Sequence, residues 1–252
     1  MNFIINPDFK FLEDDLKKVL QNFKTEGVLI GTDKRNAIKY FKVGAITINV
    51  KSFKKPSFIN SIVYKYFRKS KARRSFEYAN RLLENGVGTP QPIAFFEEYS
   101  LFGLAKSFYI SEQMQSDLTY RELVLNLDYP DYENILRQFT QFSFELHEKG
   151  IEFLDHSPGN TLIKSCGNGK YAFFLVDLNR MNFDQNLSFE RRMKNLSRLT
   201  HREDMVAMMS DEYAKLYRQS YEKIFEKMNV LTSKFQKKYH RKIELKKKLK
   251  LK

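Results

Sequence analysis

The sequence predicts an α+β fold of two lobes, a small β-rich N-terminal lobe followed by a larger helical C-terminal lobe. The chain has 252 residues, 42% of them hydrophobic, which is enough to bury a core in one two-lobed domain or two small domains. Short β-branched and aromatic runs dominate up to about residue 114. Apolar residues at helical spacing dominate after it.

The first part alternates one helical pattern with short strands. Residues 11–24 place apolar groups at helical spacing, and residues 27–31 enclose a short apolar strand between glycines. Residues 36–50 indicate two strands joined at Gly44, and the second leads directly into Lys51.

A helix and a hairpin complete the predicted N-terminal lobe. Residues 70–85 form an amphipathic pattern that ends at Gly86, because glycine readily takes the left-handed conformation after a helix. Residues 93–98 and 107–114 predict a hairpin whose second strand ends at the junction of the lobes.

The second part begins with a long helix over residues 131–149, which Gly150 ends. A polar loop, 155–160, then precedes two strands at 161–164 and 172–176.

Helical patterns return from about residue 190 to 234, followed by a lysine-rich end. The expected organisation is therefore an N-lobe over 1–112, a C-lobe over 113–232 and a basic tail over 233–252.

The formal net charge is +14, from 44 Lys+Arg against 30 Asp+Glu, and two segments carry all of it. Residues 51–74 hold nine basic residues and no acidic one, and residues 233–252 hold ten basic residues and one acidic one. A strongly basic protein commonly meets an anionic partner such as nucleic acid, a membrane surface or phosphate groups. For the first segment, a solvated face, binding of phosphorylated sugar or lipid headgroups, and nucleic acid are the alternatives. For the tail they are a disordered end, an RNA contact and an interfacial anchor.

Other classes of protein are disfavoured by composition. The single cysteine, Cys166, excludes an intramolecular disulfide and a multi-cysteine zinc site. The N-terminus lacks the pattern of a signal peptide, and no apolar run reaches the length of a transmembrane helix. We therefore expect a cytosolic protein, peripheral to a membrane at most.

Three oxygen-bearing side chains form the strongest candidate site. Asp155 and Asn160 lie at the two ends of one loop, and Asp177 follows the apolar run 173–176 of the next hairpin. Two carboxylates and an amide that converge at strand ends suit a general base and a Mg²⁺ ion, which takes its other ligands from phosphate and water.

The N-terminal lobe supplies the remaining candidates. Lys51 ends an apolar strand and is expected to reach ligand phosphates, and Glu77 on the following helix is expected to pair with it. Backbone groups around Glu112–Met114 are candidates for binding the adenine edge. Each residue also has a structural interpretation: Asp155 as a turn cap, Lys51 as a solvated edge lysine, Glu77 as a helical partner of Arg73 or Arg81.

The chain resembles the lipopolysaccharide kinase (Kdo/WaaP) family, in particular its Kdo kinases, within the protein-kinase-like superfamily. The resemblance covers roughly residues 30–200, and the segment from 176 to Leu199 is its most specific part. The matching segments are Val50–Phe53, Lys71–Glu77, Gly86–Pro92, His147–Ile151, Asp155–Asn160 and Val176–Met181.

The resemblance implies a two-lobed protein-kinase-like fold and an ATP- and Mg²⁺-dependent phosphotransferase. It implies that Lys51 contacts the α- and β-phosphates and that Glu77 orients it. Asp155 would accept the proton of the substrate hydroxyl, and Asn160 and Asp177 would hold Mg²⁺.

The chain also departs from the protein-kinase pattern. No G-x-G-x-x-G is present, and 31–36, with Lys34 and Arg35, stands where the phosphate-covering loop is expected. Ser157 replaces the lysine of Ser/Thr protein kinases, and Asp-Leu-Asn replaces Asp-Phe-Gly, with Asn179 tolerant of left-handed backbone. Ser157 argues against a protein substrate, and the short segment after Asp177 leaves little platform for a peptide.

The expected function is therefore ATP-dependent phosphorylation of a sugar hydroxyl of the lipopolysaccharide inner core, Kdo of Kdo–lipid A, at the cytoplasmic face of the inner membrane. The expected partners are ATP, the lipid A precursor and, through the basic tail, an anionic membrane surface, with nucleic acid disfavoured. Two alternatives stay open: a kinase for a heptose, another small molecule or a protein, and a pseudokinase or basic binding module.

Overall fold

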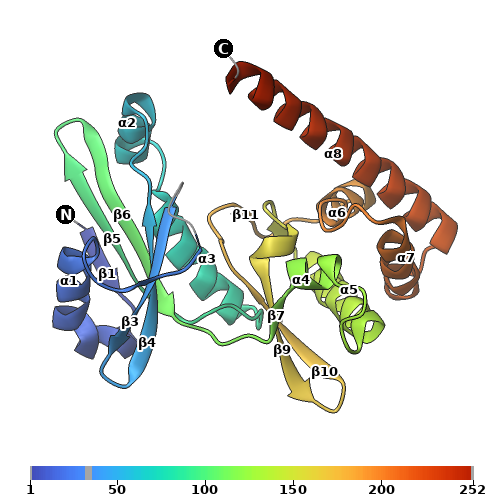
Figure 1. Ribbon diagram of the computed structural model, residues 1–252, viewed down its shortest axis with the longest axis horizontal. Helices are drawn as coiled ribbons and strands as arrows, with labels where there is room; N and C mark the ends of the chain where they lie inside the picture. The colour runs from blue at the N-terminus through green and yellow to red at the C-terminus, as the bar shows by residue number, and fades with distance from the viewer. Residues whose placement is uncertain (1, 32–35, 251–252) are drawn as a thin grey trace. The chain divides into compact units, whose positions relative to one another are not determined.

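The computed structural model describes residues 2–31 and 36–250 and divides the chain into two compact units (Figure 1). Unit 1 comprises Met1–Gln115 together with Asp177–Arg180. Unit 2 comprises Ser116–Val176 and Met181–Lys252. The segment that contains Asp177 is thus grouped with the N-terminal unit, although it follows the second hairpin of unit 2 in the chain.

Unit 1 is built on an antiparallel sheet of six strands in the order β1-β5-β6-β4-β3-β2. Its elements are β1 (Asn2–Ile5), the 3-10 helix η1 (Pro7–Leu12), α1 (Glu13–Asn22), β2 (Val28–Leu29), β3 (Asn36–Val43), β4 (Ile46–Phe53), α2 (Phe58–Tyr66), α3 (Lys71–Glu84), β5 (Pro92–Ser100) and β6 (Gly103–Glu112).

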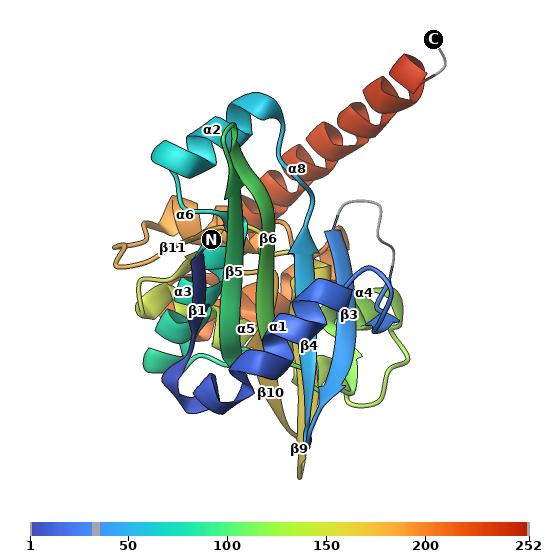
Figure 2. The ribbon, with the colours of Figure 1, turned by 90° about the vertical axis from the view of Figure 1, so that its left-hand side faces the viewer.

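Helices cover both faces of this sheet. Leu12 and Leu16 from the first helical segment share one buried cluster with Ile48 and Ile110 of the sheet, so α1 covers one face (Figure 2). On the other face, the ring of Phe76 on α3 lies 5.3 Å from that of Phe95. Since strands buried on both sides alternate little in hydrophobicity, the first part of β5, residues 92–96, is continuous in apolar residues.

Helix α2 is not among the elements that the sequence predicts. Its residues include Ile59, Ile62, Val63 and Tyr66, which are β-branched or aromatic and favour strands by propensity. Contacts with β6 stabilise the helix instead, since the Ser61 hydroxyl donates to the carbonyl oxygen of Leu104 at 2.6 Å. Tertiary contact here overrides local preference.

Unit 2 is mainly helical, with one three-stranded sheet (β10-β9-β7) and one two-stranded pair (β11-β8). Its elements are β7 (Leu118–Thr119), α4 (Tyr120–Leu125), α5 (Tyr132–Glu148), β8 (Glu152–Phe153), the 3-10 helix η2 (Pro158–Asn160), β9 (Thr161–Gly167), β10 (Lys170–Leu175), β11 (Met181–Asn182), α6 (Phe189–Leu196), α7 (Glu203–Tyr217) and α8 (Tyr221–Lys250).

The core of unit 2 forms around α5. Phe139 is fully buried, its ring stacks on that of Tyr120 at 4.0 Å, and it meets Phe173 of β10 edge-on at 5.6 Å. Tyr213 of α7 packs against Phe144, the α5 residue that lies off the main apolar stripe. The mixed α+β class, with a small antiparallel-sheet part and a helical part, is confirmed.

Helix α8 continues through the basic C-terminal residues as far as Lys250. Most of its side chains from residue 233 onward are exposed. In the part of the chain that the structure describes, no helix combines the length and the apolarity that crossing a membrane would require.

Candidate active site

Lys51 lies in the middle of the sheet of unit 1, near the end of β4. It is paired with Ile38 of β3 on one side and Tyr109 of β6 on the other, and only 9% of it is exposed. Its ammonium lies 2.7 Å from Oδ1 of Asp177, a residue 126 positions later in the chain. A buried ammonium requires such a partner, because an isolated buried charge is strongly unfavourable.

Asp177 is held by two donors in an unusual backbone conformation. Its Oδ1 accepts hydrogen bonds from Lys51 Nζ and from Asn179 Nδ2, both at 2.7 Å. Its φ is +59°, a left-handed conformation that costs energy for residues other than glycine and is enriched at functional sites. The sequence suggested Asn179 for this conformation, but Asn179 instead fixes the carboxylate of the strained residue.

The predicted pair of Lys51 with Glu77 is wrong for this structure. The carboxylate of Glu77 accepts from Lys69 Nζ at 2.8 Å and from Arg73 Nε at 2.9 Å. Partial burial raises the pKa of Glu77, but the hydrogen bonds from Lys69 and Arg73 outweigh it and the pKa is lowered. The reason is proximity along the helix: Arg73 lies four residues before Glu77, where side chains meet on one face. A role for Glu77 toward nucleotide stays a prediction.

We expect Lys51→Met to weaken Mg·ATP binding about 10- to 100-fold, because a hydrogen bond to a charged group contributes about 1.5–3 kcal/mol. Isothermal titration calorimetry with Mg·ATP measures this directly. Lys106→Met, which removes an exposed lysine paired with Glu98 in the same sheet, is the matched control and should bind as the wild type does. Equal affinity of the Lys51 variant and the control would contradict the assignment of Lys51.

The candidate catalytic loop lies in unit 2, after β8. The side-chain amide of Asn160 donates to the carbonyl oxygen of Asp155 at 2.8 Å, which closes the loop on itself. The backbone carbonyl of Asn160 accepts from Val176 N at 3.0 Å, so the residue directly before Asp177 is bonded to the end of this loop. Asp155 and Asn160 are both partly exposed.

Two buried histidines support this loop through one asparagine. Oδ1 of Asn195 on α6 lies 3.0 Å from His156 Nδ1 and 3.2 Å from His147 Nε2. Because this oxygen can only accept, both ring nitrogens donate to it, and His147 Nδ1 accepts from the hydroxyl of Tyr213 at 2.8 Å. Asn195 Nδ2 donates to the carbonyl oxygen of Phe153 at 2.7 Å. The network ties the loop to α5, α6 and α7.

Burial keeps both histidines neutral. Desolvation lowers the pKa of His147 to about 3, and the nearby charge of Arg192 acts in the same direction. Desolvation lowers the pKa of His156 to about 4. The sequence suggested a packing or capping role for His147 and left His156 undecided; the structure places both in the support of the loop and neither at its surface.

Further residues beside the loop were not singled out from the sequence. Arg198 donates to the carbonyl oxygen of Leu154, and it lies in the same family-specific segment as Asn195. Arg121 on α4 lies against the loop from another direction, since a Cβ built at Gly159 would come within 2.5 Å of its guanidinium. In the sequence, the family-specific segment that ends at Leu199 could have indicated Asn195 and Arg198. No local sequence pattern indicates Arg121.

The remaining predicted positions lie at the end of unit 1 or outside the described residues. Glu112 ends β6, and its backbone N donates to Gln91 O at 2.9 Å, so this amide is already used. Met114 is the next residue after Gln113, whose backbone N donates to the carbonyl oxygen of Thr47. Lys34 and Arg35, suggested for the phosphate-covering loop, lie outside the described residues.

Asp177 and Asn160 each offer an oxygen atom of the kind that a hard divalent cation prefers. Asp177 offers a carboxylate whose side chain is 38% exposed. The amide nitrogen of Asn160 is engaged by Asp155, which leaves its oxygen as the atom for a ligand contact. Mg²⁺ needs few protein oxygens, since phosphate and water complete its shell. Among the described residues, no group of three or more His, Cys, Asp or Glu forms an alternative metal site.

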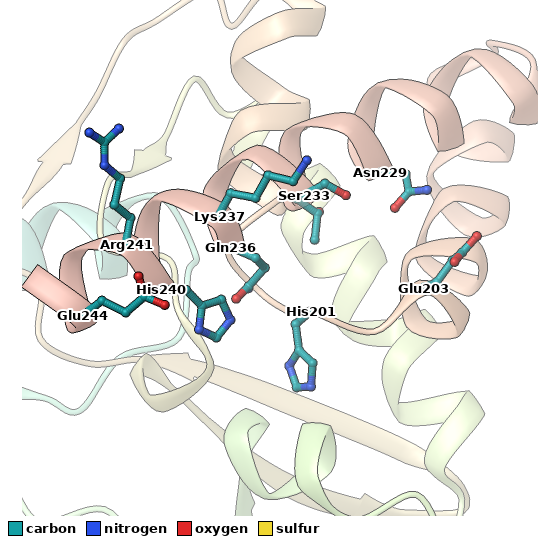
Figure 3. A pocket seen from close by; sticks show the side chains of 10 residues that line it. His201, Glu203, Asn229, Ser233, Gln236, Lys237, His240, Arg241 and Glu244 are labelled. Atoms are coloured by element: carbon teal, nitrogen blue, oxygen red, sulfur yellow. The ribbon is translucent and has the colours of Figure 1, made fainter.

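A separate hollow of about 540 Å³ in unit 2 lies along α8 and contains none of these residues (Figure 3). His201 and Glu203 line it together with the α8 side chains, which include His240 and Glu244. Its lining contains both acidic and basic side chains, which does not suit a nucleotide. The hollow is also open to solvent, which does not suit a reaction that must exclude water.

The antiparallel-sheet unit and the mainly helical unit are the two parts of a protein-kinase-like fold. The chain belongs to the lipopolysaccharide kinase (Kdo/WaaP) family, whose family model matches residues 19–221. Kinase activity and a place in lipopolysaccharide biosynthesis follow from this membership, and the family implies use of ATP and typically a divalent metal.

A solved structure described as WaaP in complex with acyl carrier protein has the same fold. It superposes with a TM-score of 0.65 at 16% identity, covering 96% of this chain and 99% of that chain. No curated protein sequence gives a significant match. The predicted family and fold are confirmed by these comparisons.

Proposed function

We propose that this protein transfers the γ-phosphate of ATP to a sugar hydroxyl of the lipopolysaccharide inner core, and that the acceptor is Kdo of Kdo–lipid A. The observation that carries the proposal is the contact of Lys51 with Asp177, which joins a strand lysine to the carboxylate after the second hairpin. The same two residue types hold nucleotide phosphates and metal in kinases.

Each residue of the motif has a proposed role. Lys51 binds the α- and β-phosphates, and its partner in this structure is Asp177 rather than Glu77. Asn160 and Asp177 would hold Mg²⁺, which would supply neutralisation of phosphate charge. Backbone groups between Glu112 and Met114 hold the adenine edge.

Asp155 accepts the proton of the attacking sugar hydroxyl. Its backbone is fixed by Asn160, so the carboxylate is presented from a closed loop. Positioning of the hydroxyl and charge neutralisation supply most of the rate enhancement in such transfers.

Features of the loop and of the segments near it in the chain support a sugar rather than a protein acceptor. Ser157 stands where Ser/Thr protein kinases carry lysine. Only a short segment, which includes β11, lies between Asp177 and the start of α6, so little chain is available as a platform for a peptide. Arg121 adds a guanidinium beside the loop, which suits an acceptor that already bears phosphate or carboxylate groups.

The test is transfer of labelled γ-phosphate from ATP to purified Kdo–lipid A, with a heptose-bearing core and a generic protein substrate in parallel. Mass spectrometry of lipid A–core from cells with and without the protein should show one added phosphate on Kdo. Transfer to the heptose-bearing core alone would show that the acceptor is a heptose rather than Kdo. Absence of any Mg·ATP-induced thermal shift would favour a pseudokinase or binding module.

The proposed location is the cytoplasmic face of the inner membrane. The lysines at the end of α8 support this, because each basic residue near an anionic leaflet contributes about 1 kcal/mol to docking. Leu245 and Leu249, both exposed, add apolar area beside them.

A further inference from the structure

One end of unit 1 exposes a cluster of large apolar side chains. Six of the eighteen exposed large hydrophobic residues among those described lie in only two segments, and they include the two most exposed of all. We name this cluster the α2 surface; its members are Phe58 (64% exposed), Ile59 (74%), Tyr66 (67%), Phe67 (82%), Leu101 (89%) and Phe102 (67%). Exposed apolar clusters of this kind mark interaction sites.

The α2 surface is a fixed feature of the fold. Figures 1 and 2 both show α2 beside the turn between β5 and β6. Ser61 is buried and bonds to Leu104 O, and Gly103 lies so close that a Cβ there would meet the Ser61 backbone at 2.5 Å. The rings of Phe58 and Phe102, one from each segment, lie 6.2 Å apart. The two segments therefore present their apolar side chains together.

Positive charge surrounds this apolar cluster. Exposed basic residues flank α2 on both sides, and no acidic residue occurs from 51 to 74. Lys69 is neutralised by Glu77 and Lys65 Nζ bonds to backbone carbonyls of the turn. The other exposed basic residues beside α2 are Lys54, Lys55, Arg68 and Lys71. In the described part of the chain, no carboxylate pairs with any of these four side chains.

A small cavity in unit 1 is lined in part by α2. It has a volume of about 230 Å³, and three lysine side chains, Lys54, Lys55 and Lys71, line it. Asn60, Tyr64 and Ser107 add neutral hydrogen-bonding groups, and the lining contains no carboxylate. Such a lining suits one phosphate group, which accepts from several ammonium and hydroxyl donors at once.

We propose that the α2 surface docks on an anionic phospholipid bilayer, with its aromatic and aliphatic side chains in the headgroup region and a lipid phosphate in the lysine-lined cavity. Aromatic side chains favour the boundary between headgroups and acyl chains, and basic residues beside them are attracted by anionic lipid. Charge complementarity selects this occupant over a neutral surface. The proposal goes beyond the phosphotransfer reaction and places a docking contact on unit 1, in addition to the tail.

Vesicle co-sedimentation of the full-length protein, without ATP or acceptor, tests the proposal. The vesicles contain phosphatidylglycerol mixed with phosphatidylethanolamine, with phosphatidylcholine alone as the neutral reference. We expect the triple variant Phe67→Ser, Leu101→Ser, Phe102→Ser to lower the partition coefficient on anionic vesicles at least tenfold. The double variant Phe11→Ser, Leu125→Ser removes similarly exposed side chains elsewhere and should bind as the wild type does.

A second set of variants tests the charges. Lys54→Gln, Lys55→Gln and Lys71→Gln together should lower binding to anionic vesicles at least tenfold. The control with the same charge change uses exposed lysines outside α2 and the tail: Lys42→Gln, Lys164→Gln and Lys170→Gln. An equal loss in this control and in the cavity variant would overturn the proposal, since net charge alone would then explain the binding.

Other outcomes also overturn it. The proposal fails if the apolar triple variant and the lysine triple variant both bind anionic vesicles as strongly as the wild type does. It also fails if the wild type does not bind these vesicles. If the variants keep vesicle binding but lose binding to purified acyl carrier protein, the surface docks a protein instead. Unchanged thermal unfolding midpoints establish that the variants are folded. Because no substrate is present, these results are independent of whether the protein phosphorylates Kdo.

Discussion

Asp155→Ala is expected to reduce phosphate transfer to the sugar acceptor about 10²- to 10⁴-fold, the usual contribution of a positioned general base. The side chain is partly exposed at the start of the closed loop, and its backbone oxygen, which Asn160 holds, is kept in the variant. The fold should therefore persist. Transfer of labelled phosphate to Kdo–lipid A at saturating Mg·ATP measures the effect.

The control for this change is Asp128→Ala, which removes an exposed carboxylate from a loop elsewhere in unit 2. Its activity and unfolding midpoint should equal those of the wild type. Asp155→Asn, which keeps the shape of the side chain, should lose as much activity as Asp155→Ala. Wild-type turnover in either Asp155 variant would show that another group accepts the proton.

Acid is expected to destabilise the protein through His147 and His156. In the unfolded chain each has a pKa of about 6.5, while in the folded protein burial lowers the pKa values to about 3 and about 4. The unfolded state therefore binds more protons below pH 6.5, so the contribution to stability is present above it and is lost as the pH falls. Between pH 7 and pH 5 each histidine should cost about 2 kcal/mol of unfolding free energy.

Denaturant unfolding at the two pH values measures this loss, and His156→Asn is its matched control. The amide nitrogen of asparagine can replace the Nδ1–H donor to Asn195, but asparagine does not titrate. The loss between pH 7 and pH 5 should therefore fall by about 2 kcal/mol in the variant. An undiminished loss would show that His156 does not contribute to the acid sensitivity.

Local patterns predicted most of the regular structure. The paired strands on either side of Gly44, the helix that ends before Gly86 and the long helix before Gly150 all form as their periodicity indicates. These elements bury one face or stripe, and the spacing of apolar residues records that face directly. Helix α2 was missed because it has no buried apolar stripe: Phe58, Ile59 and Tyr66 are exposed. Its many β-branched and aromatic residues favour strands by propensity, so neither spacing nor propensity indicates a helix.

In the candidate site the structure corrects the expected pairing, while the roles of the residues stay predictions. Lys51, Asp155, Asn160 and Asp177 were chosen by residue type and by position at the ends of elements. That Lys51 contacts Asp177 rather than Glu77 follows from distances that the spacing along the chain does not contain. The support of the loop by Asn195 and two histidines likewise joins three helices that are separate in sequence.

The sequence by itself determined the α+β class, the ordered kinase-like motifs and the separation of the +14 charge into two basic segments. Each of these depends only on the types of residues and their order along the chain, so it is present in the sequence before the chain folds. Only the tertiary structure decided which charged groups pair, that the buried histidines are neutral, and that Phe58, Tyr66 and Phe67 within the first basic segment are exposed. These depend on desolvation and on contacts between distant segments, and both come into existence only when the chain packs.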